Sequence, residues 1–166
     1  MSGKWLEGQA LGNKERLKGI LGRQAAAAEQ ERLDEEAASA KAKNAKSVRA
    51  EVIQKWREQR AHLETYIAQI NTETSKNGVQ LFVVKDPSQA EIESGMEVDK
   101  MEVAFRERSP HGEKLVISVR ANGEAYVSIS TSSVTRAEQS TLHVLEVTNE
   151  QLEATVLDFL DANIPK

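Results

Sequence analysis

The 166-residue sequence contains no cysteine. Disulfide bonds, thiolate catalysis and metal sites with cysteine ligands are therefore excluded. The sequence also lacks an apolar run close to the roughly 20 residues that cross a bilayer, and its first residues lack the apolar core of a signal peptide. We therefore expect a cytoplasmic protein without a membrane span.

Apolar residues are scarce as well. They make up 39% of the sequence, whereas about 45–50% is usual for globular domains, so the length fits one folded domain and an extension. Charge is unevenly distributed: residues 1–78 contain 14 Lys and Arg and 11 Asp and Glu, whereas residues 79–166 contain 8 and 15. The formal charge of −4 is therefore +3 in the first part and −7 in the second. The two parts should attract each other or different partners.

A heptad-like stripe of apolar residues is the main feature of residues 46–78. Its members follow one another in steps of four and three residues, with Gln59 in the one gap, and they are Val52, Trp56, Leu63, Tyr66 and Ile70. Neither Pro nor Gly interrupts this stretch before Gly78. The pattern predicts a long amphipathic, coiled-coil-like helix from about Ser47 to Lys76, with Asn77 and Gly78 as its stop.

Such a helix is about 45 Å long at 1.5 Å per residue, which is more than a small domain covers. Large apolar side chains left exposed at its N-terminal end would forfeit about 1.5–3 kcal/mol each. We therefore expect a homo-oligomer, most simply a dimer, that associates through Val52, Ile53, Trp56 and Leu63. The sequence does not decide between parallel and antiparallel association.

Residues 1–45 have the composition of a polar, partly helical or disordered arm. Ala, Glu, Gln and Lys dominate residues 23–45, which favours a solvated helix. Before them, Asn13 and Gly22 are placed as the N-cap and the stop of a short helix. Its apolar side would consist of Leu17, Ile20 and Leu21. This side is a candidate docking motif for a partner or a membrane-surface helix, and the alternative is a frayed terminus.

Residues 79–166 change to a period of two, which predicts β-strands. Strands are expected at 79–84, at 96–106, on both sides of the loop 121–123, and at 141–147. The sequence from Thr148 to Gln151 has the form of a capping box. It opens a last helix whose apolar side contains Leu152, Val156, Phe159, Leu160 and Ile164. The predicted fold is α+β: a long N-terminal helix, an antiparallel meander of four or five strands in residues 79–166, and a C-terminal amphipathic helix packed on one sheet face.

Face matching predicts the strand registers. The alternation in residues 96–106 slips at Asp99-Lys100, which predicts a β-bulge there. A turn at Ser109-Pro110-His111-Gly112 would set Phe105 opposite Ile117 and Val103 opposite Val119. A three-residue loop, Ala121-Asn122-Gly123, pairs Val119 with Ala125, Ile117 with Val127 and Leu115 with Ile129.

The opposite face of this hairpin is rich in hydroxyl groups. It carries Tyr126, Ser128 and Ser130, which are further candidates for docking a partner. A third surface is the basic side of the long helix, with Lys46, Arg49, Lys55, Arg57 and Arg60 as candidate nucleic-acid contacts. Trp56 lies on the apolar stripe rather than among these charges, and the net charge is negative, which weighs against nucleic acid.

The sequence offers few residues or motifs that are typical of catalysis. The three histidines are His62, His111 and His143. His62 follows Glu58 at helical spacing, which most often makes an ordinary surface contact. No nucleophile elbow, P-loop, dinucleotide fingerprint or EF-hand spacing occurs. We expect no cofactor, no metal and no enzyme.

The predicted function is a non-enzymatic scaffold, adaptor or assembly chaperone that binds another protein. The alternatives are a nucleic-acid-binding protein and, least favoured, an enzyme with an unrecognised site.

Overall fold

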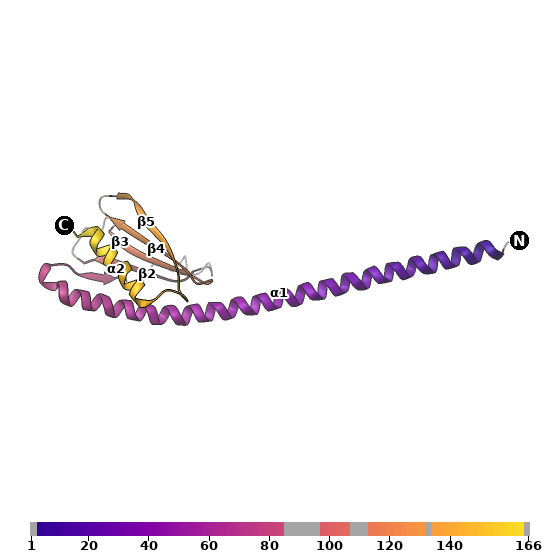
Figure 1. The fold of residues 1–166 in the computed structure, drawn as a ribbon, viewed down its shortest axis with the longest axis horizontal. Helices are drawn as coiled ribbons and strands as arrows, with labels where there is room; N and C mark the ends of the chain where they lie inside the picture. Colours follow the sequence, from indigo (N-terminus) through magenta and orange to yellow (C-terminus); the bar gives the residue numbers. More distant parts are fainter. Residues whose placement is uncertain (1–2, 85–96, 107–112, 132–133, 165–166) are drawn as a thin grey trace. The chain divides into compact units, whose positions relative to one another are not determined.

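The computed structural model describes residues 3–84, 97–106, 113–131 and 134–164. The chain begins with helix α1 (Gly3–Thr74), which a short 3-10 helix, η1 (Ser75–Asn77), extends. A β-sheet and helix α2 (Asn149–Asn163) follow (Figure 1). The chain divides into two compact units, Met1–Asn44 and Ala45–Lys166, so α1 contributes to both. Within the described residues, no helix is long and apolar enough to cross a membrane.

Helix α1 is continuous through Gly22, where the sequence favours a stop. The run of alanines at 25–28 explains this continuity, because alanine has the highest helix propensity. The predicted stop after Lys76 is confirmed. Gly78 has φ +70°, and its N–H donates to the Ser75 carbonyl at 3.4 Å. Only glycine adopts this left-handed conformation without a steric penalty.

Five antiparallel strands form one sheet within the described residues. They are β1 (Leu81–Val83), β2 (Glu97–Phe105), β3 (Lys114–Arg120), β4 (Glu124–Thr131) and β5 (Val134–His143), in the spatial order β1-β2-β3-β4-β5. Each strand therefore pairs with the next one in sequence. The predicted α+β fold with an antiparallel meander is confirmed.

The β3–β4 hairpin has the predicted register. Val119 pairs with Ala125, Ile117 with Val127 and Leu115 with Ile129. Gly123 closes the loop with φ +94°, and its N–H donates to the Arg120 carbonyl at 3.0 Å. Matching buried faces across a short loop was sufficient to determine this pairing.

The predicted β2–β3 register is wrong. Met101 pairs with Ile117 and Val103 with Leu115, so the strands are displaced by four residues from the expected pairing. The displacement is even, so every side chain keeps its predicted face. The bulge lies between Glu97 and Asp99, slightly before the expected position. The turn predicted at residues 109–112 lies outside the described residues.

The fifth strand also differs from the prediction. It spans Val134–His143 rather than residues 141–147. Residues 144–147 form a turn in which the Val147 N–H donates to the His143 carbonyl at 2.8 Å. Val144 and Val147 are nevertheless buried, 0% and 7% exposed. Their apolar character reflects burial in a turn, which periodicity alone does not distinguish from a strand.

Both helices cover the same face of the sheet. The core joins α1 side chains such as Leu63 to inward-facing strand residues and to Phe159 of α2. The rings of Phe105 and Phe159 lie 5.1 Å apart. The predicted capping box at Thr148 and Gln151 is present, and it begins α2 with Leu152 and Val156 facing the sheet.

Candidate interaction surfaces

The apolar stripe of α1 is covered by its own chain. Val52, Trp56 and Leu63 are 0%, 2% and 0% exposed, and all three belong to the core that α1 forms with the sheet and α2. Ile53 is half-buried. The premise of the predicted self-association, an uncovered stripe at these four residues, is therefore wrong. The sheet and α2 supply the apolar surface that the sequence analysis assigned to a second copy.

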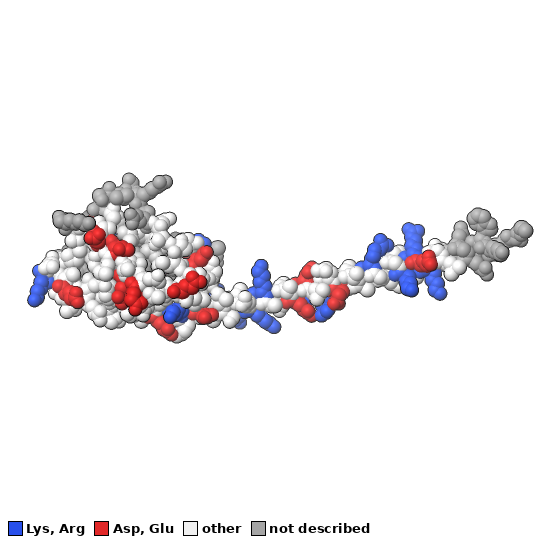
Figure 2. Space-filling model, viewed as in Figure 1, with Lys and Arg blue, Asp and Glu red and all other residues white. Residues whose placement is uncertain are grey.

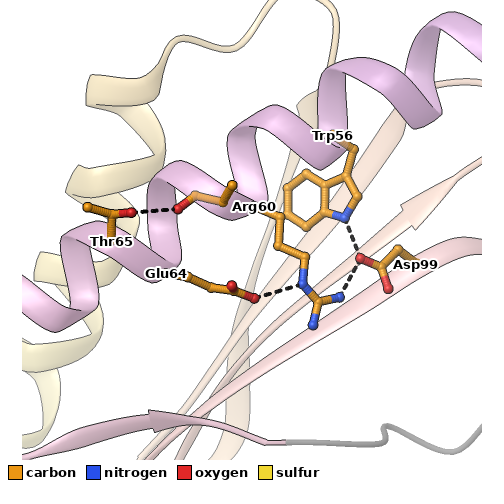
Figure 3. Close-up of polar contacts among 6 residues, drawn as sticks. Trp56, Arg60, Glu64, Thr65 and Asp99 are labelled. Atoms are coloured by element: carbon orange, nitrogen blue, oxygen red, sulfur yellow. Dashed lines mark hydrogen bonds and ion pairs between the residues drawn. The ribbon is translucent and has the colours of Figure 1, made fainter.

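Three polar side chains fix α1 to strand β2 at the N-terminal part of this stripe. The Trp56 indole Nε1 donates to the Asp99 carboxylate at 2.6 Å, and the Arg60 guanidinium donates to the same oxygen at 2.5 Å (Figure 3). Arg60 also contacts Glu64 at 3.2 Å. The bulge before Asp99 gives this residue its place opposite Val119, beneath α1. This cluster holds helix and sheet together, a role that the sequence analysis did not assign to Asp99.

Gln59 is a second polar link that the sequence analysis missed. It lies on the apolar stripe and is 2% exposed. Its side-chain amide donates to the carbonyls of Val144 and Val147 at 3.0 and 3.2 Å. These carbonyls belong to the turn between β5 and α2. A polar residue inside a heptad stripe was the signal that this position has a specific partner.

His62 pairs with α2 rather than with Glu58. Its Nε2 lies 2.6 Å from a Glu153 carboxylate oxygen, whereas Glu58 accepts a hydrogen bond from Gln54. His143 lies on β5 opposite Glu124, and His111 lies outside the described residues. Among the described residues, no group of three or more His, Asp and Glu side chains is arranged to hold a metal ion. His62 therefore has a structural contact that accounts for its place.

The candidate nucleic-acid contacts do not form one continuous face. Lys46, Arg49, Lys55 and Arg57 are exposed, but Arg60 is engaged by Asp99 and Glu64. Lys55 and Arg57 are two residues apart, and side chains at that spacing do not share a helix face. Lys55 instead borders a depression with Glu51 and Glu58. Nucleic-acid binding by this set stays a prediction.

The open face of the sheet satisfies many of its polar groups internally. Tyr126 is 37% exposed, and its hydroxyl donates to Glu124 at 3.0 Å. The Arg120 guanidinium lies 4.5 Å from the centre of the Tyr126 ring. Hydrogen bonds from the Asn122 side chain and then from Tyr126 lower the pKa of the Glu124 carboxyl. Ser128 and Ser130 are half-buried on the same strand. Docking at these residues stays a prediction.

The N-terminal segment of α1, residues 11–44, has a different character. Every described side chain in it is exposed. The predicted docking residues Leu17, Ile20 and Leu21 are 56%, 44% and 54% exposed. Figure 2 shows basic groups towards both ends of this part of the helix and mainly acidic groups between them. Its ion pairs are local ones, since Arg32 contacts Glu29 at 2.6 Å and Glu36 at 2.5 Å.

Two depressions lie in the unit Ala45–Lys166. One, of about 520 Å³, is bordered by Ala45, Val48 and Ala121 beside Lys46, Arg49 and Asn122. The other, of about 620 Å³, lies between α2 and the strands β4 and β5, and Asp158 and Ser140 are among its lining residues. Comparison of the chain with protein-family models, with curated proteins and with solved structures gave no match.

Proposed function

We propose that the protein is a non-enzymatic scaffold or adaptor that acts by binding other proteins, and that it associates with a second copy through the N-terminal segment of α1. One observation carries this proposal. The same helix that supplies core residues at Val52–Ile70 continues into residues 11–44, whose described side chains are all exposed. Self-association therefore belongs to the N-terminal segment, and not to the buried stripe where the sequence analysis expected it.

The energetics of an isolated helix support a partner. Gly12, Gly19 and Gly22 lie within α1, and each glycine in a helix interior costs about 0.5–1 kcal/mol relative to alanine. Helices in proteins owe most of their stability to the packing of an apolar face. Leu17, Ile20 and Leu21 form such a face, because Ile20 and Leu21 follow Leu17 by three and four residues. A second helix on this face would offset the cost of the glycines.

Two matched substitutions test the proposal. Leu21→Glu places a charge on the exposed apolar face, whereas Leu33→Glu makes the same change at a leucine that is 46% exposed and lies away from that face. Glutamate is a good helix former, so neither change breaks the helix. We expect the parent and Leu33→Glu to be dimers by light scattering at micromolar concentration, and Leu21→Glu to be a monomer. A monomeric parent up to millimolar concentration would overturn the proposed self-association.

A further inference from the structure

The heptad phase of the buried stripe continues into the exposed segment of α1. Counting back from Val52 in steps of three and four reaches a series of positions that share one side of the helix: Arg49, Ala45, Ala42, Ala38, Glu35, Glu31, Ala28, Gln24, Leu21, Leu17 and Lys14. Most of them are small or apolar, and three of the four charged ones are Lys14, Glu31 and Glu35. The series has the spacing of a coiled-coil seam, with charges at positions that face a partner.

These charges discriminate between the two directions in which two copies can pair. A parallel, in-register pair would place Lys14 beside Lys14, Glu31 beside Glu31 and Glu35 beside Glu35. Like charges within a helix interface are unfavourable. An antiparallel pair centred between Gly22 and Arg23 instead places Lys14 opposite Glu31 of the second copy, and the symmetry makes this contact twice.

The same antiparallel register matches side-chain sizes. It sets Leu17 opposite Ala28 of the second copy, and Ile20 beside Ala27 of the second copy. Leu17 and Ile20 thus meet small side chains, which lets facing helices pack closely, and Leu21 lies opposite Gln24 of the second copy. Moving the register along the seam by fourteen residues, so that Leu17 meets Ala42, sets Glu31 opposite Ala28 and leaves both acidic positions without a basic partner. The register with the Lys14–Glu31 contact is therefore the favoured one.

The extent of the pairing agrees with the division of the chain. In this register the two segments overlap over residues 3–42, and the folded unit begins at Ala45. The glycines also fit. Gly12, Gly19 and Gly22 all fall outside the seam, on the side of the helix that faces away from the second copy. Their lack of a side chain therefore leaves no gap in the interface.

We infer that residues 3–42 of α1 pair with the same residues of a second copy in antiparallel direction, with Lys14 opposite Glu31. This inference rests on the proposed function, because it names the partner and the direction of the self-association. It also answers the question of helix direction that composition and spacing alone left open.

Charge reversal tests the Lys14–Glu31 contact. In the antiparallel pair, Glu31→Lys creates two Lys–Lys contacts, and we expect the dimer dissociation constant to rise about ten- to a hundredfold. Lys14→Glu together with Glu31→Lys restores both contacts in swapped form and should return the constant to within about threefold of the parent. A parallel pair has like charges at both positions before and after either change, so the double variant would then show no rescue.

Distances between spin labels test the direction independently, and the absence of native cysteine allows single labelled positions. Ala26→Cys and Ala40→Cys are exposed and lie outside the seam. At 1.5 Å per residue, the offset along the helix axis between the two copies' labels is about 42 Å larger at position 40 than at position 26 in the antiparallel pair. Equal distances at both positions would establish a parallel pair and overturn the inference while leaving the proposed self-association intact. A complete lack of dipolar coupling at concentrations up to millimolar would overturn both.

Discussion

Two stretches of one helix differ in what they bury. Residues 52–70 of α1 place Val52, Trp56, Leu63, Ile67 and Ile70 in the core, none more than 7% exposed. Residues 11–44 of the same helix bury no described side chain. The heptad phase is the same in both, but large apolar residues occupy it in the first stretch, and alanine and charged residues occupy most of it in the second. Periodicity therefore sets which side of a helix is used, and the size of the side chains indicates what kind of partner that side meets.

The largest expected effect comes from removing a buried side chain from the first stretch. Trp56→Ala should lower the free energy of unfolding by about 3–5 kcal/mol, because it empties a core position and leaves the Asp99 carboxylate without the indole donor. Leu33→Ala, at a side chain that is 46% exposed and lies outside the seam, is the matched change in the second stretch. It should alter the same quantity by less than about 0.5 kcal/mol. Native-state hydrogen exchange of the β3 and β4 amides measures both, and equal losses would contradict the contrast.

A glycine in the folded unit gives the next largest effect. Gly123→Ala forces an L-residue to φ +94°, and the new Cβ would lie 2.7 Å from the His143 ring and 3.3 Å from Val52. Strain and overpacking together should lower the free energy of unfolding by about 2–4 kcal/mol. Urea denaturation monitored by circular dichroism measures the change. An unchanged midpoint would mean that the β3–β4 loop does not contact α1 closely.

Gln59 offers a smaller effect within the buried stretch. Gln59→Ala removes both donors to the Val144 and Val147 carbonyls, which should cost about 1–3 kcal/mol because buried acceptors lose their partners. Gln54→Ala is the exposed counterpart on the same helix, where only a surface contact to Glu58 is lost, and it should cost less than about 0.5 kcal/mol. Chemical denaturation of both variants provides the comparison. If the two changes were equal, the turn after β5 would not depend on α1.

Local patterns in the sequence predicted the elements that short-range chemistry determines. The capping box at Thr148, the stop at Gly78 and the loop at Gly123 were each predicted because a few neighbouring residues specify them. The β2–β3 register was not, because alternation specifies only which face a residue takes, and an even displacement leaves all faces unchanged. The extent of β5 was missed for a similar reason, since Val144 and Val147 are apolar without being in a strand.

The candidate surfaces were less predictable than the fold. The stripe at Val52, Trp56 and Leu63 signals burial, but a helical period does not say whether the covering surface belongs to the same chain or to another. Only the three-dimensional structure shows that the sheet of the same chain covers this stripe. The contacts of Asp99 and His62 joined residues 43 and 91 positions away, respectively, which no local pattern indicates. Leu17, Ile20 and Leu21 are exposed, but they lie on the continuous helix α1 rather than on a separate short helix, and docking at them stays a prediction.

The smallest effect concerns the exposed stretch and has the opposite sign. Gly22→Ala should stabilise α1 by about 0.5–1 kcal/mol, because alanine loses less backbone entropy in a helix and a Cβ at Gly22 meets no atom of the chain within 4 Å. The same substitution at Gly123 is destabilising, so the pair of variants contrasts the two regions with identical chemistry. Thermal unfolding of the helical signal at 222 nm measures the gain. If antiparallel pairing leaves Gly22 outside the seam, the gain should appear without any weakening of the dimer. A Gly22→Ala variant that dissociates more readily than the parent would instead place Gly22 within the interface, where a close helix approach requires the missing side chain.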